Sequence, residues 1–196
     1  MIAQARDTDG DCWLATERLA LRRFTPADLD WLTELYSIEE VARWVGGTKN
    51  RAEVSQLLDV RILKYYDDNP GLGNWMTIER ATGTPVGFHL LNHIQGESFI
   101  QVGFVLGKPS WGKGYGTEMA AALVRYGFVD LALPQIVGIT NLDNYRSQHV
   151  LEKVGLHRNG ERAFPHPAYS VAGPMAWFER DAIDWLAERG PNGLDD

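Results

Sequence analysis

Residues 99–120 read FIQVGFVLGKPSWGKGYGTEMA, and this stretch decides which fold the chain adopts. An apolar run breaks at Gly107, glycines follow at Gly112, Gly114 and Gly116, and the residues after them favour a helix. Glycine lacks a side chain, so the backbone N–H groups of such a loop can approach an anion closely. A helix that begins here adds unpaired N–H groups and the positive end of its dipole. The stretch therefore predicts a strand, a phosphate-binding loop and a helix in succession.

Two common phosphate motifs fail on this loop. Gly107, Gly112 and Lys113 fit the G-x-x-x-x-G-K of the P-loop, but Gly114 stands where that motif needs a Ser or Thr hydroxyl to hold Mg²⁺. A dinucleotide fingerprint G-x-G-x-x-G that starts at Gly112 lacks its last glycine. These mismatches make a protein that binds nucleotide phosphates the weakest of the three functions that the sequence suggests. Mg²⁺-dependent binding of ATP would favour it.

The loop resembles the acetyl-coenzyme A loop of the GNAT superfamily of N-acetyltransferases, Q/R-x-x-G-x-G/A, with Trp111 in the first position. The run WGKGYGTE over 111–118 is similar to the form common in the branch of ribosomal-protein N-terminal acetyltransferases. The run NYRSQHVLEKVGL over 144–156 resembles the family's N-x-x-S-x-x-V-L-E-K-x-G-F, and ERLALRRF over 17–24 resembles the branch's opening strand. The resemblance covers roughly residues 16–180.

Composition sets independent bounds. A chain of 196 residues with 44% hydrophobic content can bury the core of one domain, which we expect over residues 16–189 between polar tails at 1–15 and 190–196. A net charge of −7 argues against a nucleic-acid partner. The single cysteine, Cys12, permits no internal disulfide, and no apolar stretch is long enough to span a bilayer. We expect a soluble, cytoplasmic protein.

The residue pattern and the resemblance together imply an α/β (α+β) fold of the GNAT type. It has a single mixed, mostly antiparallel sheet of about six to seven strands, splayed in the middle and flanked by helices. The pattern predicts strands at Arg18–Phe24, Gly73–Arg80, Pro85–Ile94, Ser98–Leu106 and Gln135–Asn141, with two more between Leu156 and Glu179. It predicts helices from Pro26, over Ile38–Val45, Asn50–Asp67, Gly116–Leu131 and Tyr145–Val154, and a last short one through Trp185.

The resemblance implies acetyl-CoA as cosubstrate and names its contacts. The backbone of the splayed strand would hold the pantetheine arm, the glycine loop would hold the pyrophosphate, and an asparagine side chain would reach the arm. In this sequence the implied cofactor-binding residues are Phe104, Val105, Leu106, Gly112, Lys113, Gly114, Tyr115, Gly116, Thr117 and Asn144. Lys113 can equally be a solvated loop lysine, and Glu118 is expected to complement the helix dipole.

Acetyl transfer to an amine needs a proton donor for the leaving thiolate and a base for the amine. The resemblance implies Ser147 as the donor, since the tyrosine that other branches place four residues later is Leu151 here. The family's glutamate on the strand is replaced by Gln101, so the base is His93, Glu97, His89 or a water chain that ends on one of them. His89 and His93 share a strand face about 13 Å apart, too far to share a metal, and no metal site is expected.

The acceptor is a primary amine by resemblance: a protein N-terminus, a small amine or an aminoglycoside-like compound. The regions that wall the family's acceptor site contain Trp44, Tyr65, Tyr66, Trp75, His166 and Tyr169, with Glu39, Glu40, Asp67 and Asp68 as attractors of a cation. A homodimer is compatible with the sequence. Because Gln101 cannot accept a proton, a non-catalytic domain that binds or senses acyl-CoA is the alternative to an N-acetyltransferase.

Overall fold

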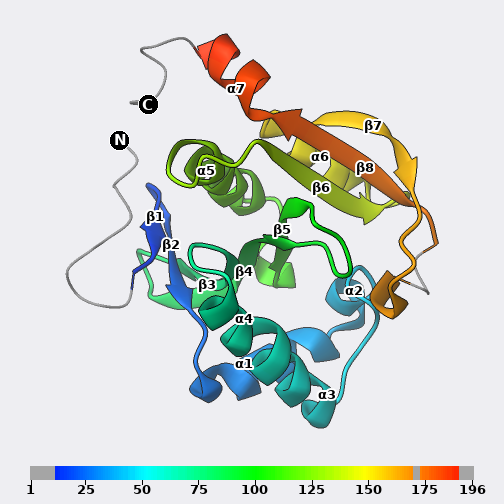
Figure 1. Ribbon diagram of the computed structural model, residues 1–196. Helices are drawn as coiled ribbons and strands as arrows, with labels where there is room; N and C mark the ends of the chain where they lie inside the picture. The colour runs from blue at the N-terminus through cyan, green and yellow to red at the C-terminus, as the bar shows by residue number, and fades with distance from the viewer. Residues whose placement is uncertain (1–11, 170–172, 190–196) are drawn as a thin grey trace.

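The computed structural model describes residues 12–169 and 173–189, and it contains one eight-stranded sheet in the order β1-β2-β3-β4-β5-β6-β8-β7 (Figure 1). The expected GNAT fold class is confirmed, with one strand more than the seven that the pattern predicted. The strands are β1 (Leu14–Ala15), β2 (Leu19–Arg23), β3 (Gly73–Glu79), β4 (Thr84–His93), β5 (Ile100–Leu106), β6 (Gln135–Asn141), β7 (His157–Arg162) and β8 (Met175–Asp181).

The additional strand, β1, pairs Leu14 with Leu21 and belongs to the segment 1–15 that was expected to be a tail. Two residues are too short for a readable alternation of apolar and polar side chains, which explains why the pattern missed it. The rest of that expected tail, residues 1–11, and the expected tail at 190–196 lie outside the described residues.

The sheet is split between β5 and β6. These two strands run parallel and share a single register pair, Gln101 with Val137, whereas the neighbouring pairs are antiparallel and continue along the strands. No described residue of β6 pairs with β5 beyond Gln101, so one backbone edge of residues 102–106 is open. Figure 1 shows the result as two groups of strands, β1–β4 with α1 to α4, and β6–β8 with α6 and α7.

Helices cover both groups. They are α1 (Leu29–Ser37), α2 (Glu39–Ala42), α3 (Arg51–Gln56), α4 (Lys64–Asp68), α5 (Tyr115–Val129), α6 (Tyr145–Lys153) and α7 (Ala182–Arg189). Short 3-10 turns lie at Pro26–Asp28, Lys108–Ser110 and Pro167–Tyr169, and a π-helix, η2 (Leu57–Leu63), joins α3 to α4. None of the helices in the described ranges is long and apolar enough to cross a bilayer.

Two predicted helices need correction. The pattern over Ile38–Val45 yields only the four-residue α2. The predicted helix over Asn50–Asp67 does begin at Asn50, whose side chain accepts the Ala52 and Glu53 N–H groups as a cap, but its middle is the π-helix η2. Apolar periodicity does not distinguish a π-turn from an α-turn, so the sequence pattern could not show this change.

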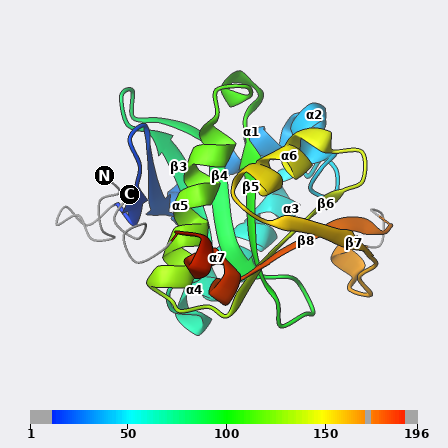
Figure 2. The same cartoon turned by 90° about the horizontal axis from the view of Figure 1, so that it is seen from above.

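Helix α5 packs over β4 and β5 (Figure 2), and glycines set how closely it lies. A Cβ on Gly116 would sit 3.2 Å from the Phe104 ring, and one on Gly127 would sit 2.6 Å from Ile136. Met119, Ala120 and Leu123 face the sheet and are buried. The close contact fixes where the helix N-terminus stands relative to β5.

Glu118 lies in the first turn of α5, where it was expected to complement the helix dipole, and it also joins α5 to the residues just before β2. Its Oε1 accepts hydrogen bonds from the Thr16 hydroxyl at 2.6 Å and the Arg18 N–H at 3.0 Å, and its Oε2 accepts from Arg18 Nε at 2.6 Å. Burial alone would raise the pKa of Glu118, but these hydrogen bonds and the Arg18 charge outweigh it and hold the pKa below its ordinary value of 4.5.

We predict that Glu118→Gln lowers the free energy of unfolding at pH 7 by about 1–2 kcal/mol, because charge-assisted hydrogen bonds are replaced by weaker ones. Since the folded pKa is lowered, the carboxylate's contribution is present above pH 4.5 and is lost as the pH falls through the folded pKa. Urea denaturation of both proteins from pH 7 to pH 3 measures this gap. Glu17→Gln, an exposed neighbour, is the control, and a gap that stays constant into acid would contradict the prediction.

Candidate active site

The loop between β5 and α5 has the backbone that its glycines predicted. Gly112 and Gly114 have φ of +74° and +81°, in the left-handed region that residues with a Cβ adopt only at a cost. The first hydrogen bond into the helix is Glu118 N–H to Gly114 O at 3.0 Å, so the preceding N–H groups of the first turn have no acceptor within the helix. These groups form a cluster of donors directed outward from the end of β5.

Two side chains hold this loop in place. The Trp111 indole N–H donates to the Leu106 carbonyl at 2.7 Å, which ties the loop back onto the last residue of β5. The Arg18 guanidinium donates to the Lys113 carbonyl at 3.0 Å while it binds Glu118. Trp111 therefore has a structural reason to replace the Gln or Arg of the common motif. The Leu106 carbonyl, an expected contact of the pantetheine arm, already has a donor.

Three further residues of the loop, Gly112, Gly116 and Lys113, have different surroundings. A Cβ on Gly112 would meet no atom within 4 Å, so space for a ligand is open there. At Gly116 a Cβ would lie 3.2 Å from the Phe104 ring, so packing favours glycine there. Lys113 Nζ lies 5.8 Å from the centre of the Tyr115 ring and has no carboxylate in an ion pair among the described residues. Its charge can add to the donor cluster.

Helix α6 supplies Asn144 and Ser147. The Asn144 side-chain oxygen accepts the Ser147 N–H at 3.2 Å, so Asn144 is the N-cap and its amide N–H₂ is left for another partner. The half-buried Ser147 hydroxyl has no hydrogen bond within the described residues, and its hydrogen is available to a ligand. Buried Gln148 closes the turn before the helix by donating to the carbonyls of Asn141 and Leu142.

His89 is not a base in this fold. Its side chain is fully buried, its Nδ1 lies 2.7 Å from the Thr77 hydroxyl, and its ring packs on Phe104. Burial lowers the pKa of His89 to about 3, although the Gly116 backbone and Glu118 act against it. A neutral, enclosed imidazole is a core residue, so this candidate is corrected.

The place of the family's glutamate is occupied by a row of amides. Gln101 Nε2 donates to Asn92 Oδ1 at 3.2 Å, and Asn92 Nδ2 donates to Asn74 Oδ1 at 3.3 Å. The row crosses β5, β4 and β3 on the face toward α1 to α4. It contains no carboxylate, so a proton acceptor has to come from outside it.

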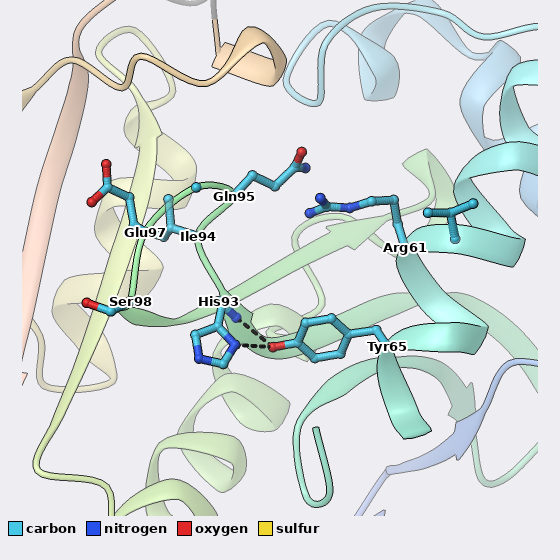
Figure 3. Close-up of a pocket in the computed structure, with 9 residues that line it drawn as sticks. Arg61, Tyr65, His93, Ile94, Gln95, Glu97 and Ser98 are labelled. Carbon is cyan, nitrogen blue, oxygen red and sulfur yellow. Dashed lines mark hydrogen bonds between the residues drawn. The ribbon is translucent and has the colours of Figure 1, made fainter. Parts of the chain in front are cut away.

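A cavity of about 520 Å³ opens where β4 ends and β5 begins (Figure 3). It lies at the opposite end of β5 from the glycine loop. His93 and Glu97 both line it, so the structure brings these two candidates together. Ser147 does not line it and lies on α6 in the other half of the sheet. The full lining is Val60, Arg61, Tyr65, His93, Ile94, Gln95, Gly96, Glu97 and Ser98.

Tyr65 and His93 form a hydrogen-bonded pair at the cavity wall, drawn with dashed lines in Figure 3. The His93 backbone N–H donates to the Tyr65 hydroxyl oxygen at 2.9 Å, and this oxygen lies 2.6 Å from His93 Nδ1. Because the oxygen already accepts the N–H, the hydroxyl hydrogen is free to donate to Nδ1, which leaves the proton of a neutral ring on Nε2. Burial raises the pKa of Tyr65, so the phenol keeps its hydrogen at neutral pH.

The aromatic residues expected in the acceptor wall are divided between the core and the cavity. Trp75 and Tyr66 are buried in the core, whereas Tyr65 lines the cavity. The Tyr169 hydroxyl oxygen accepts a hydrogen bond from the Gln95 N–H at 3.2 Å, which places Tyr169 beside the cavity. Glu39, Glu40, Asp67 and Asp68 do not line it, and Glu40 is paired with Lys108 at 2.6 Å. The sequence analysis missed Arg61. It lies on a predicted helix, and no sequence signal distinguishes it from an ordinary solvated arginine.

The sheet is thus split, with a glycine loop at one end of the open strand β5 and a cavity at the other. The model of the acetyltransferase (GNAT) domain family matches residues 18–157. The N-acetyltransferase p20 of Bacillus licheniformis, itself uncharacterised, is 31% identical over 160 residues, which cover 76% of this chain and 88% of that protein. The chain therefore belongs to the GNAT acetyltransferase family.

Solved structures share the fold. A Vibrio cholerae protein provisionally named a ribosomal-protein-serine acetyltransferase superposes with a TM-score of 0.70 at 22% identity, over 85% of this chain and 95% of that one. The aminoglycoside acetyltransferase AAC(6')-Ib, crystallised with paromomycin and acetyl-CoA, has a TM-score of 0.70 at 21% identity, over 89% and 99%. Its membership of the family makes the chain an acetyl-CoA-dependent N-acetyltransferase, and the two solved structures agree with it in fold.

We predict that Gly114→Glu abolishes acetyl-CoA binding, because it places a carboxylate in the donor cluster and strains a left-handed backbone position. Calorimetric titration with acetyl-CoA measures the loss. Gly160→Glu is the matched control, since Gly160 in β7 has φ of +85° and open space around its Cα. Unchanged titration of the Gly114 variant would remove the loop from the cofactor site.

Proposed function

We propose that the enzyme moves acetyl from acetyl-CoA to a primary amine by direct attack in a ternary complex. The observation that carries this proposal is the position of the loop and the cavity at the two ends of β5, whose seven residues extend roughly 20 Å. A cofactor bound by its phosphates at the loop and extended along the open edge would present its acetyl group toward the cavity. An amine in the cavity would meet it there.

The proposed cofactor contacts are the backbone of Phe104, Val105 and the Leu106 N–H, the N–H groups of residues 112–117, and the Asn144 amide. Direct attack suits the available nucleophiles. The single cysteine, Cys12, precedes β1 and does not line the cavity, so a covalent acyl-enzyme on sulfur has no residue to form it.

We assign the two proton transfers to different sides of the split sheet. As the amine nitrogen bonds to the acetyl carbon, its proton passes to the Tyr65 oxygen while the Tyr65 hydroxyl hydrogen passes to His93 Nδ1, so the ring gains one proton and the phenol is restored. As the C–S bond breaks, the Ser147 hydroxyl gives its proton to the thiolate; Ser147 then regains a proton from solvent and His93 releases its extra proton to solvent. Glu97 attracts the ammonium form of the acceptor, which loses its first proton to water before the nitrogen attacks.

The proposal is tested first by calorimetry with acetyl-CoA, followed by thiol release against amines and peptide N-termini. Binding with release supports it. Binding without release from any amine would instead support the sensing domain that Gln101 suggested.

We predict that Ser147→Ala lowers kcat by about 10- to 100-fold and leaves the dissociation constant of acetyl-CoA unchanged, because the serine acts on the leaving thiolate and not on the resting cofactor. A timed thiol-release assay gives kcat, and calorimetric titration gives the dissociation constant of acetyl-CoA. Ser37→Ala, an exposed serine at the end of α1, is the control. A loss of affinity without a loss of kcat would make Ser147 a binding residue.

We predict that Tyr65→Phe and His93→Gln each lower kcat/KM by about 100-fold and that the double variant loses no more than either single one, because both act in one proton relay. Glu97→Gln should raise KM and leave kcat within about threefold. If the loss of kcat/KM in the double variant equals the product of the two single losses, the two side chains act independently. A loss of kcat in Glu97→Gln would move the base to Glu97.

A further inference from the structure

Arg61 stands apart from the other arginines of the described ranges. Each of the others has an ion pair, a hydrogen bond, an aromatic ring or another partner, whereas Arg61 forms no ion pair, hydrogen bond or ring contact with any residue of 12–169 and 173–189. It lines the cavity, and its guanidinium extends toward Gln95 across the opening (Figure 3). An arginine that the fold does not use, directed into a cavity, is free to bind a ligand.

The backbone that carries Arg61 is unusual. It lies in the π-helix η2 (Leu57–Leu63), which ends with the Lys64 N–H donating to the Asp59 carbonyl five residues back. π-turns are rare, and they occur frequently at functional sites because they rotate side chains away from the register of the flanking α-helices. Here the segment directs Val60 and Arg61 to the cavity, and Tyr65 of the following α4 joins them.

Arg61 has no counter-ion among the described residues, and both polar and apolar side chains line the cavity around it. Although the residue as a whole is exposed, partial burial at the cavity wall lowers the pKa of Arg61, and the nearby phenols of Tyr169 and Tyr65 offset part of this. Glu97 is the one carboxylate among the lining residues, and it forms no ion pair with Arg61. A partly desolvated guanidinium without a carboxylate partner favours an anion from solution.

We infer that the acceptor of this enzyme is a small amine that also carries a carboxylate, with Arg61 as the residue that binds the carboxylate. The inference rests on the proposed function and adds the substrate class. A guanidinium binds a carboxylate through two parallel hydrogen bonds, which fixes the orientation of the ligand as well as its position. The carboxylate at Arg61 leaves the amine directed across the cavity, where the Tyr65–His93 pair and Glu97 stand.

The same arrangement disfavours a polycation such as an aminoglycoside. A cationic acceptor would place a positive charge beside an unpaired arginine, and the carboxylates that were expected to attract it do not line the cavity. The aminoglycoside acetyltransferase that shares the fold is therefore a guide to the fold and not to this acceptor.

The test compares three amino acids with their own carboxamides as acceptors: glycine, β-alanine and 4-aminobutyrate, which differ in the spacing of amine and carboxylate. Thiol release gives kcat/KM for each compound with the wild type, Arg61→Gln, Arg61→Lys and the control Lys64→Gln. Lys64 is an exposed cation on the next turn that does not line the cavity, so its variant carries the same change of charge. Each compound is compared with itself across variants, which cancels differences in amine basicity.

We expect Arg61→Gln to lower kcat/KM about 10- to 100-fold for the best carboxylate acceptor and less than threefold for its carboxamide, mainly through KM. Arg61→Lys should recover part of the loss, and Lys64→Gln should leave both compounds unchanged. Equal losses for acid and amide would overturn the inference. Thiol release with an aminoglycoside or a peptide amide, but with none of the carboxylate-bearing amines, would also overturn the inference. That outcome would leave the proposed function in place. Absence of release with every amine, despite acetyl-CoA binding, would overturn both.

Discussion

The structure depends on the separation of β5 from β6 after Gln101. If the parallel ladder that begins at Gln101 and Val137 continued, the backbone of residues 102–106 would be fully paired and no ligand could lie along it. The strands instead diverge, and α5 begins beside the opening with Gly116 against Phe104. An interior backbone edge without partners is costly in a finished fold, which is why a cofactor that supplies the missing partners suits this place.

Bracing of the glycine loop comes from distant parts of the chain. Arg18, the residue before β2, binds Glu118 and the Lys113 carbonyl at once, and the Trp111 indole binds the end of β5. A loop with two residues in left-handed conformations would otherwise be free to move, and donors that point at a phosphate are useful only when held still. The ion pair between Arg18 and Glu118 therefore holds the loop that we propose as the phosphate site.

The elements that could be predicted from sequence are those whose backbone chemistry restricts the residue type. A left-handed turn calls for glycine at Gly112 and Gly114, and a helix start calls for a cap such as Asn144. The partner of Glu118 could not be predicted, because Arg18 lies one hundred residues away and a carboxylate in a first helical turn already has a local reason to be there. Likewise, the strand pattern assigned His89 to one face of its strand but could not predict that the side chain is fully buried.

The acceptor cavity escapes sequence reading for a related reason. Its polar groups come from the segments 60–65 and 93–98, with Tyr169 beside them, and no local pattern links these segments. The π-helix that turns Arg61 into the cavity leaves the apolar periodicity of its segment intact. The proposed cofactor site is thus one contiguous loop with a recognisable composition, whereas the proposed acceptor site is assembled from separate side chains. Under the proposed function, changes in those segments alter the acceptor without disturbing the loop, because the two sites share no residues.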